Sequence, residues 1–152
     1  MKTLGVYDLC QIVDTECLYY SLFMVNKKIK KFLGVDWGEK RLGLALGDSE
    51  IRTAVPFKVV NNLEGVLAEV AREEIDKIII GQPFKLSGDR RLPAAFKNFV
   101  DSVRKRAGVE VELIDERLSS KAADALAGSK KTKAPRDAIA AMLILQSYLD
   151  KA

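Results

Sequence analysis

The chain has 152 residues, of which 48% are hydrophobic and 30% are charged, and its net charge is +4. This length and composition are typical of one globular domain with its own core, and they argue against a disordered chain. The sequence contains no histidine, which excludes Ser–His and Cys–His nucleophiles, imidazole acid–base catalysis and histidine-bound zinc. The mild basic excess is compatible with a polyanionic partner, but ordinary solvated surfaces have it as well.

The first part of the chain, residues 1–31, is predicted to be an extension that precedes a single domain over residues 32–152. Acidic residues interrupt its apolar stretch, so it lacks the core of a signal peptide. No run in the chain approaches the roughly 18 apolar residues of a membrane span. The two cysteines, Cys10 and Cys17, have no second pair with which to build a zinc site or a disulfide framework. We therefore expect a cytoplasmic protein without membrane contact. Met24, followed by a basic stretch, is an alternative start of the folded unit, which would make the residues before it an appendage or a start-site artefact.

The domain opens with a predicted antiparallel meander of three strands. Phe32–Val35 is apolar and predicts a strand that ends at Asp36. The tetrapeptide Trp37–Lys40 is typical of a hairpin turn, in which its glycine supplies the permissive backbone. Leu42–Gly47 predicts the returning strand, and Ala54–Val60 predicts the third.

Helices and strands alternate in the rest of the chain. The predicted elements are a helix over Leu63–Glu74, a strand in DKIIIGQP, a helix over Leu92–Ala107, a strand in VEVELID, a short helix from Ser119 or Ser120 to Ala127, and a closing helix from about Pro135 to Leu149. In the first of these helices the apolar residues follow helical spacing, and the acids are expected on the opposite face. The later strands must run parallel to the first, because helical crossovers separate them. The sequence therefore predicts an α/β fold with a five-stranded mixed sheet and helices on both faces.

Three acids are expected at the ends of elements that meet at one edge of this sheet. Asp36 ends the first strand, Glu116 follows the last strand, and Asp137 lies in the first turn of the closing helix. Ligands gather at the carboxyl ends of neighbouring parallel strands. Three carboxylates without histidine would form an oxygen-rich site suited to Mg²⁺ or Mn²⁺. Such ions can activate water and stabilise the leaving oxygen in phosphodiester cleavage.

Each of these features also has a structural explanation. Glu116 and Asp137 precede or begin helices, where the helix dipole alone favours an acid. Asp48 is expected to be an ordinary turn residue at a strand end. Asp36 is the hardest to explain structurally, because it closes a buried strand beside a tight turn. The loop before the closing helix would be merely solvated if it stood alone, but beside a metal site its cations are natural contacts for backbone phosphates: Lys130, Lys131, Lys133 and Arg136.

Four segments, which together run in order from Phe32 to Leu149, resemble the YqgF family, also called RuvX. They are LGVDWGEKRLGLALGD, IIIGQPFKLSG, DERLSSKAADAL and KAPRDAIAAMLILQSYL. The family comprises small bacterial ribonuclease H-like proteins described as Holliday-junction resolvases and pre-16S rRNA nucleases. Two positions depart from the family pattern: Glu39 stands where Thr is usual, and Gln82 stands where an apolar residue is usual. Glu39 adds negative charge near the expected path of the phosphates.

The resemblance implies a ribonuclease H-like fold and a metal-dependent endonuclease that hydrolyses nucleic-acid phosphodiester bonds. The implied roles are 5′-end maturation of pre-16S rRNA or cleavage of branched DNA such as Holliday junctions. Asp36, Glu116 and Asp137 would be the catalytic acids and the ligands of Mg²⁺ or Mn²⁺. Basic residues near these acids in the sequence are expected to hold the nucleic-acid backbone: Lys40, Arg41, Arg117, Lys131, Lys133 and Arg136.

Two other functions remain open at this point. A non-catalytic nucleic-acid-binding or ribosome-assembly factor could keep the same fold and acids. An actin-like ATPase or sugar kinase also carries an Asp-x-Gly hairpin, although such proteins clamp the nucleotide between two related domains and this chain supplies one. The expected partner is structured RNA or branched DNA, and the protein could be a monomer or a homodimer.

Overall fold

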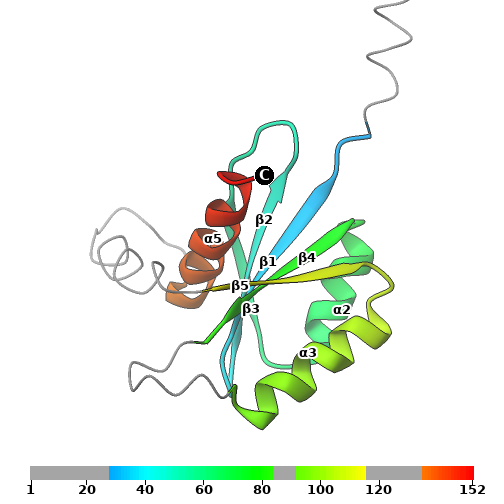
Figure 1. Ribbon diagram of the computed structural model, residues 1–152, viewed down its shortest axis with the longest axis vertical. Coiled ribbons are helices and arrows are strands. Elements are labelled where there is room, and N and C mark those ends of the chain that lie inside the picture. Colours follow the sequence, from blue (N-terminus) through cyan, green and yellow to red (C-terminus); the bar gives the residue numbers. More distant parts are fainter. Residues whose placement is uncertain (1–27, 84–91, 116–134) are drawn as a thin grey trace, which may run out of the picture.

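The computed structural model describes residues 28–83, 92–115 and 135–152 (Figure 1). The strands are β1 (Lys31–Trp37), β2 (Leu42–Asp48), β3 (Val55–Val60), β4 (Lys77–Gln82) and β5 (Glu110–Asp115), and the helices are α2 (Leu63–Arg72), α3 (Ala94–Arg106) and α5 (Arg136–Leu149). They form a five-stranded sheet with the order β3-β2-β1-β4-β5. The first three strands are antiparallel neighbours, and β4 and β5 continue the sheet parallel to β1. The predicted mixed sheet is confirmed; the short helix predicted from Ser119 or Ser120 lies outside the described residues.

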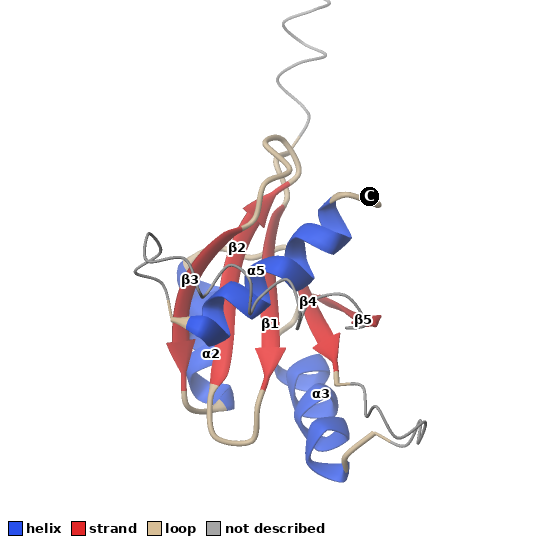
Figure 2. Cartoon of the chain, turned by 90° about the vertical axis from the view of Figure 1, so that its left-hand side faces the viewer, coloured by secondary structure: helices blue, strands red, loops and turns tan. Residues whose placement is uncertain are grey.

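Helices cover both faces of the sheet, as predicted. Figure 1 shows α5 on one side and α2 and α3 on the other, and Figure 2 shows α5 lying across the face of β1 and β2. The alternation of side chains in β1 divides the core accordingly. Leu33 and Val35 pack in the cluster shared with α2 and α3, whereas Phe32 packs in the cluster shared with α5. Along a strand every second side chain points to the same face, so Asp36 lies on the α5 face together with Phe32.

Small residues in β1 and β2 allow α5 to lie directly on the sheet. A Cβ atom at Gly34 would lie 2.7 Å from the Leu145 Cβ, and one at Gly47 would lie 3.0 Å from the Leu149 Cδ1. At Gly43 an added Cβ would overlap the carbonyl oxygen of Asp137. These contacts fix the direction of α5: its N-terminus rests on the start of β2, which pairs with the end of β1.

The predicted distribution of acids on α2 is wrong for one residue. Asn62 caps this helix by accepting a hydrogen bond from the Gly65 amide at 2.9 Å. Glu69, however, is buried on the apolar side, because two cations neutralise it there. Its Oε1 accepts a hydrogen bond from Lys58 Nζ at 2.6 Å, and its Oε2 lies 2.6 Å from Arg72 Nη2. A buried carboxylate is tolerated only with such partners.

Two turn predictions have different outcomes. Asp48 is a turn residue as expected, since its Oδ1 accepts hydrogen bonds from the amides of Glu50 at 2.9 Å and Ile51 at 2.7 Å. Gly38 does lie in the β1–β2 turn, but its φ is not left-handed. Glycine is required there because a Cβ would lie 2.7 Å from the carbonyl oxygen of Arg41.

The predicted extension overlaps the described residues only at residues 28–31. There, Asp76 accepts hydrogen bonds from Lys28 Nζ at 2.7 Å and from the Lys31 amide at 3.0 Å. Lys31 is already the first residue of β1. Of the helices in the described ranges, none has the length and apolar character that crossing a membrane requires.

Candidate active site

Asp36 lies near the carboxyl end of β1 and is half-buried. In the antiparallel register with β2 it pairs with Gly43. The next residue, Trp37, faces the other side of the sheet and packs edge-on against Phe96 of α3, with ring centroids 5.4 Å apart. This aromatic contact anchors the end of β1, beside Asp36, to α3.

Asp137 lies in the first turn of α5, where the sequence places it. Pro135 occupies the N-cap position, and its carbonyl oxygen accepts a hydrogen bond from the Ile139 amide at 3.1 Å. The partial positive charge at a helix N-terminus favours an acid in this turn. Because the Asp137 backbone rests on Gly43 and Gly43 pairs with Asp36, the two acids occupy the same edge and the same face of the sheet.

The carboxyl end of β5 reaches the same edge. In the parallel register, Val35 of β1 pairs with Ile80 of β4, and Ile80 pairs with Leu113 of β5. Asp36 follows Val35 and Ile114 follows Leu113, so these two residues lie at the same height along the sheet, on either side of β4. Asp115 shares its side of β5 with Leu113, which packs in the core under α2 and α3. By the alternation of a strand, Asp115 therefore lies on the face opposite to Asp36. Its neighbour Glu116 lies outside the described residues.

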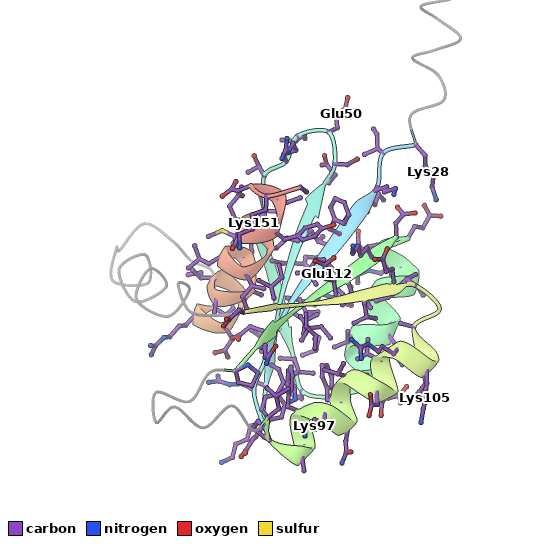
Figure 3. The ribbon with its side chains drawn as sticks, in the orientation of Figure 1. Lys28, Glu50, Lys97, Lys105, Glu112 and Lys151 are labelled. Carbon is purple, nitrogen blue, oxygen red and sulfur yellow. The ribbon has the colours of Figure 1, made fainter. Side chains whose placement is uncertain are left out.

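The basic residues predicted to bind nucleic acid fall into two groups. Lys40 and Arg41 lie in the β1–β2 turn, and Arg136 is the first residue of α5; all three are exposed at the edge that carries Asp36 and Asp137. The remaining three lie outside the described residues: Arg117, Lys131 and Lys133. Other lysines project from α3, on the layer opposite to α5, among them Lys97 and Lys105 (Figure 3).

One cation of the turn contacts an acid of the site. The Nε of Arg41 lies 3.3 Å from the Oδ2 of Asp137. The side chain of Arg41 is 67% exposed, whereas that of Asp137 is 29% exposed. The guanidinium thus reaches from the surface to a carboxylate that is largely covered.

The donor atoms on this edge suit a hard divalent cation. Asp36 and Asp137 supply carboxylate oxygens, which Mg²⁺ and Mn²⁺ prefer, and the chain has no histidine to favour zinc or copper. Within the described ranges no cluster of three or more acids or cysteines forms a metal site. Glu116, the third predicted ligand, lies outside those ranges. Two carboxylates on one face still match the way Mg²⁺ binds, through one or two protein ligands and several waters.

Two parts of this arrangement were not predicted from the sequence. One is the contact between Gly43 and the Asp137 backbone, and the other is the ion pair of Arg41. A signal for the first exists in β2, whose alternate residues Gly43, Ala45 and Gly47 are all small. Small residues at every second position leave one face of a strand flat, which allows a helix to approach closely.

A family model described as "RuvX: Holliday junction resolvase" matches residues 30–151. The chain belongs to the RuvX family. Among its relatives, a protein of Maridesulfovibrio salexigens is 34% identical over 134 residues, which cover 80% of this chain and 99% of the relative. One of Chloroflexus aggregans is 36% identical over 130 residues, which cover 78% of this chain and 92% of the relative. Both carry the name "Putative pre-16S rRNA nuclease".

The fold of this RuvX-family chain also has a relative among solved structures. RuvC of Thermus thermophilus, in complex with a Holliday junction substrate, superimposes with a TM-score of 0.53 at 19% sequence identity. The match covers 80% of this chain and 94% of that one. The predicted ribonuclease H-like fold is confirmed.

Proposed function

We propose that this RuvX-family protein is a metal-dependent nuclease that hydrolyses phosphodiester bonds, with pre-16S rRNA as its substrate and branched DNA as the alternative. One observation carries the proposal: the contact between Gly43 and the Asp137 backbone brings Asp137 to the same edge and face as Asp36. The names of the relatives support the choice of RNA, and the name of the family model supports branched DNA.

In this proposal Asp36, Asp137 and Glu116 hold Mg²⁺ or Mn²⁺. The bound ion would activate water and stabilise the leaving oxygen of the scissile bond. Asp36 is fixed by pairing within the sheet, and Asp137 is fixed by the packing of α5. We choose Glu116 over its neighbour as the third acid because Asp115 lies on the opposite face, with Leu113.

The exposed cations of the same edge would position the substrate. Lys40 and Arg41 flank the site from the β1–β2 turn, and Arg136 flanks it from the start of α5. Contacts of such side chains with phosphates fix the register of a nucleic acid without reading its sequence. We include the remaining cations of the predicted interface in this role: Arg117, Lys131 and Lys133.

The test is a cleavage assay with purified protein, Mg²⁺ or Mn²⁺, a labelled pre-16S rRNA fragment and a labelled four-way DNA junction. Asp36→Asn, Glu116→Gln and Asp137→Asn should each lower the cleavage rate by more than the roughly 10–100-fold that is typical for residues that only support a metal ligand. Asp101→Asn is the matched control, because this exposed acid lies on α3, on the other layer of the fold. It should cleave like the wild type.

Three results would contradict the proposal. Equal cleavage by the wild type and Asp36→Asn would mean that the proposed site takes no part in cleavage. Nucleic-acid binding that survives chelation, with no turnover under any divalent ion, would instead favour a non-catalytic binding factor. Saturable binding of ATP at micromolar concentration, in the same protein, would favour the actin-like alternative.

A further inference from the structure

The ion pair between Arg41 and Asp137 links a predicted phosphate-binding residue to a predicted metal ligand. Its two atoms are 3.3 Å apart, and the guanidinium is attached to a turn rather than to a helix or strand. With its side chain 67% exposed, Arg41 can leave the carboxylate without opening the core. A surface ion pair of this kind stabilises a protein little, because solvent screens it and ordering the long side chain costs entropy.

A divalent cation and Arg41 would compete for the same carboxylate. Both are attracted to Asp137, but the cation has twice the charge and is also attracted to Asp36. Once the cation is present, it repels the guanidinium at short range. Arg41 would then be released at the edge where a phosphate of the substrate is expected to lie, and a guanidinium binds phosphate well.

We propose that Arg41 neutralises Asp137 while no divalent cation is bound, and that it transfers to a backbone phosphate when the cation takes the carboxylate. This inference rests on the proposed function, since it assumes the metal site at Asp36 and Asp137. It makes the metal and the nucleic acid bind cooperatively through one side chain. Cooperativity of this kind is reciprocal: the metal raises the affinity for nucleic acid by the same factor as the nucleic acid raises the affinity for the metal.

The experiment compares the wild type, Arg41→Gln and Lys40→Gln. Glutamine removes the charge and keeps much of the side-chain length, and Lys40 is the matched control because it lies in the same turn. Calorimetry gives the affinity for Ca²⁺, an oxygen-binding ion, with free protein and with protein bound to an RNA stem–loop. Fluorescence anisotropy gives the affinity for the labelled RNA with Ca²⁺ and with EDTA, and a gel verifies that the RNA stays intact.

Arg41→Gln should bind Ca²⁺ roughly two- to fivefold more tightly than the wild type in the absence of RNA, which corresponds to the usual strength of a surface ion pair. Its affinity for RNA in Ca²⁺ should fall, with a salt dependence reduced by about one phosphate contact. The factor by which Ca²⁺ strengthens RNA binding should shrink by the same two- to fivefold. Lys40→Gln should weaken RNA binding and leave that factor as in the wild type.

Three results would overturn the inference. Unchanged or weaker Ca²⁺ binding by Arg41→Gln, with a lowered Tm, would mean that the ion pair only fastens α5 to the turn. Equal tightening in Lys40→Gln would mean that general charge causes the effect. If Ca²⁺ strengthens RNA binding by the same factor in Arg41→Gln as in the wild type, Arg41 does not transfer between Asp137 and a phosphate. Asp36→Asn separates the two proposals: if it binds Ca²⁺ like the wild type, the proposed metal site itself fails.

Discussion

The contact between Gly43 and α5 makes a sharp prediction for Gly43→Ala. The new methyl group would overlap the carbonyl oxygen of Asp137 and lie 3.0 Å from the amide nitrogen of Ala138. Both are backbone atoms at the start of a helix, so no side-chain rotation relieves the overlap and the helix start must retreat. Overpacking of this kind costs about 1–3 kcal/mol of the free energy of unfolding, which lowers the Tm by several degrees for a domain of this size.

The same substitution should reduce turnover far more than its effect on stability explains. A displacement of about 1 Å in a catalytic group can cost roughly 100-fold in rate, and the proposed function makes Asp137 such a group. The assay measures the rate of RNA cleavage well below the Tm of the variant, together with its affinity for Mn²⁺. Both should fall, because Asp137 would no longer share a cation with Asp36.

Gly47→Ala is the matched control for this prediction. Its added Cβ would approach Leu149 Cδ1 at 3.0 Å and Leu145 Cδ2 at 3.2 Å, which are ends of side chains in the C-terminal part of α5, and the Thr53 carbonyl oxygen at 3.3 Å, which is a close contact rather than an overlap. We expect a smaller loss of stability and near wild-type turnover. If Gly43→Ala cleaves RNA as fast as Gly47→Ala, the packing of α5 on β2 does not set the geometry of the site, and the reasoning fails.

Three further predictions concern stability. The hydrogen bond from Lys28, and then the one from the Lys31 amide, lower the pKa of Asp76. The contribution of Asp76 to the free energy of unfolding is therefore present above the ordinary carboxyl pKa and is lost as the pH falls through the lowered value. Asp76→Asn should narrow the difference in Tm between pH 7 and pH 3. Glu69→Ala should cost about 2 kcal/mol in urea unfolding, because it removes the charge-assisted bond of Lys58 and the ion pair of Arg72, two cations that stay partly solvated. Gln146→Ala should cost about 1–2 kcal/mol in the same measurement, because it removes hydrogen bonds to the Ala54 amide and the Arg52 carbonyl.

The sequence predicts well what depends on the chain's local period. Apolar runs and alternating apolar residues, bounded by turn residues, place the strands, and the position of Asp36 at a strand end follows from the first of these runs. Helical spacing predicts the extent of α5 and so the place of Asp137 in its first turn. The spacing of apolar residues along the chain does not predict which side chains of different elements are in contact. Glu69 was therefore expected in solvent, although Lys58 of a neighbouring strand makes its burial tolerable.

The same limit explains why the role of Gly43 and the ion pair of Arg41 need the structure. Gly43 is one of ten glycines in the chain, and its sequence neighbours do not reveal that a helix start nearly a hundred residues later will rest on it. Arg41 follows Lys40 in a turn, where both are natural phosphate ligands. Only the position of α5 distinguishes the two cations, because it brings Asp137 within 3.3 Å of Arg41.

The two ends of α5 are held by different means, and this bears on how the site is positioned. At the C-terminal end, Arg52 donates hydrogen bonds to the carbonyl oxygens of Leu149, at 2.7 Å, and of Ala152, and Gln146 bonds to the β2–β3 connection. At the N-terminal end, the helix backbone rests on Gly43 without any intervening side chain. A helix fixed at both ends cannot slide along the sheet. Asp137 therefore keeps its place relative to Asp36 before any cation binds, and in the proposed exchange the exposed side chain of Arg41 moves rather than the helix.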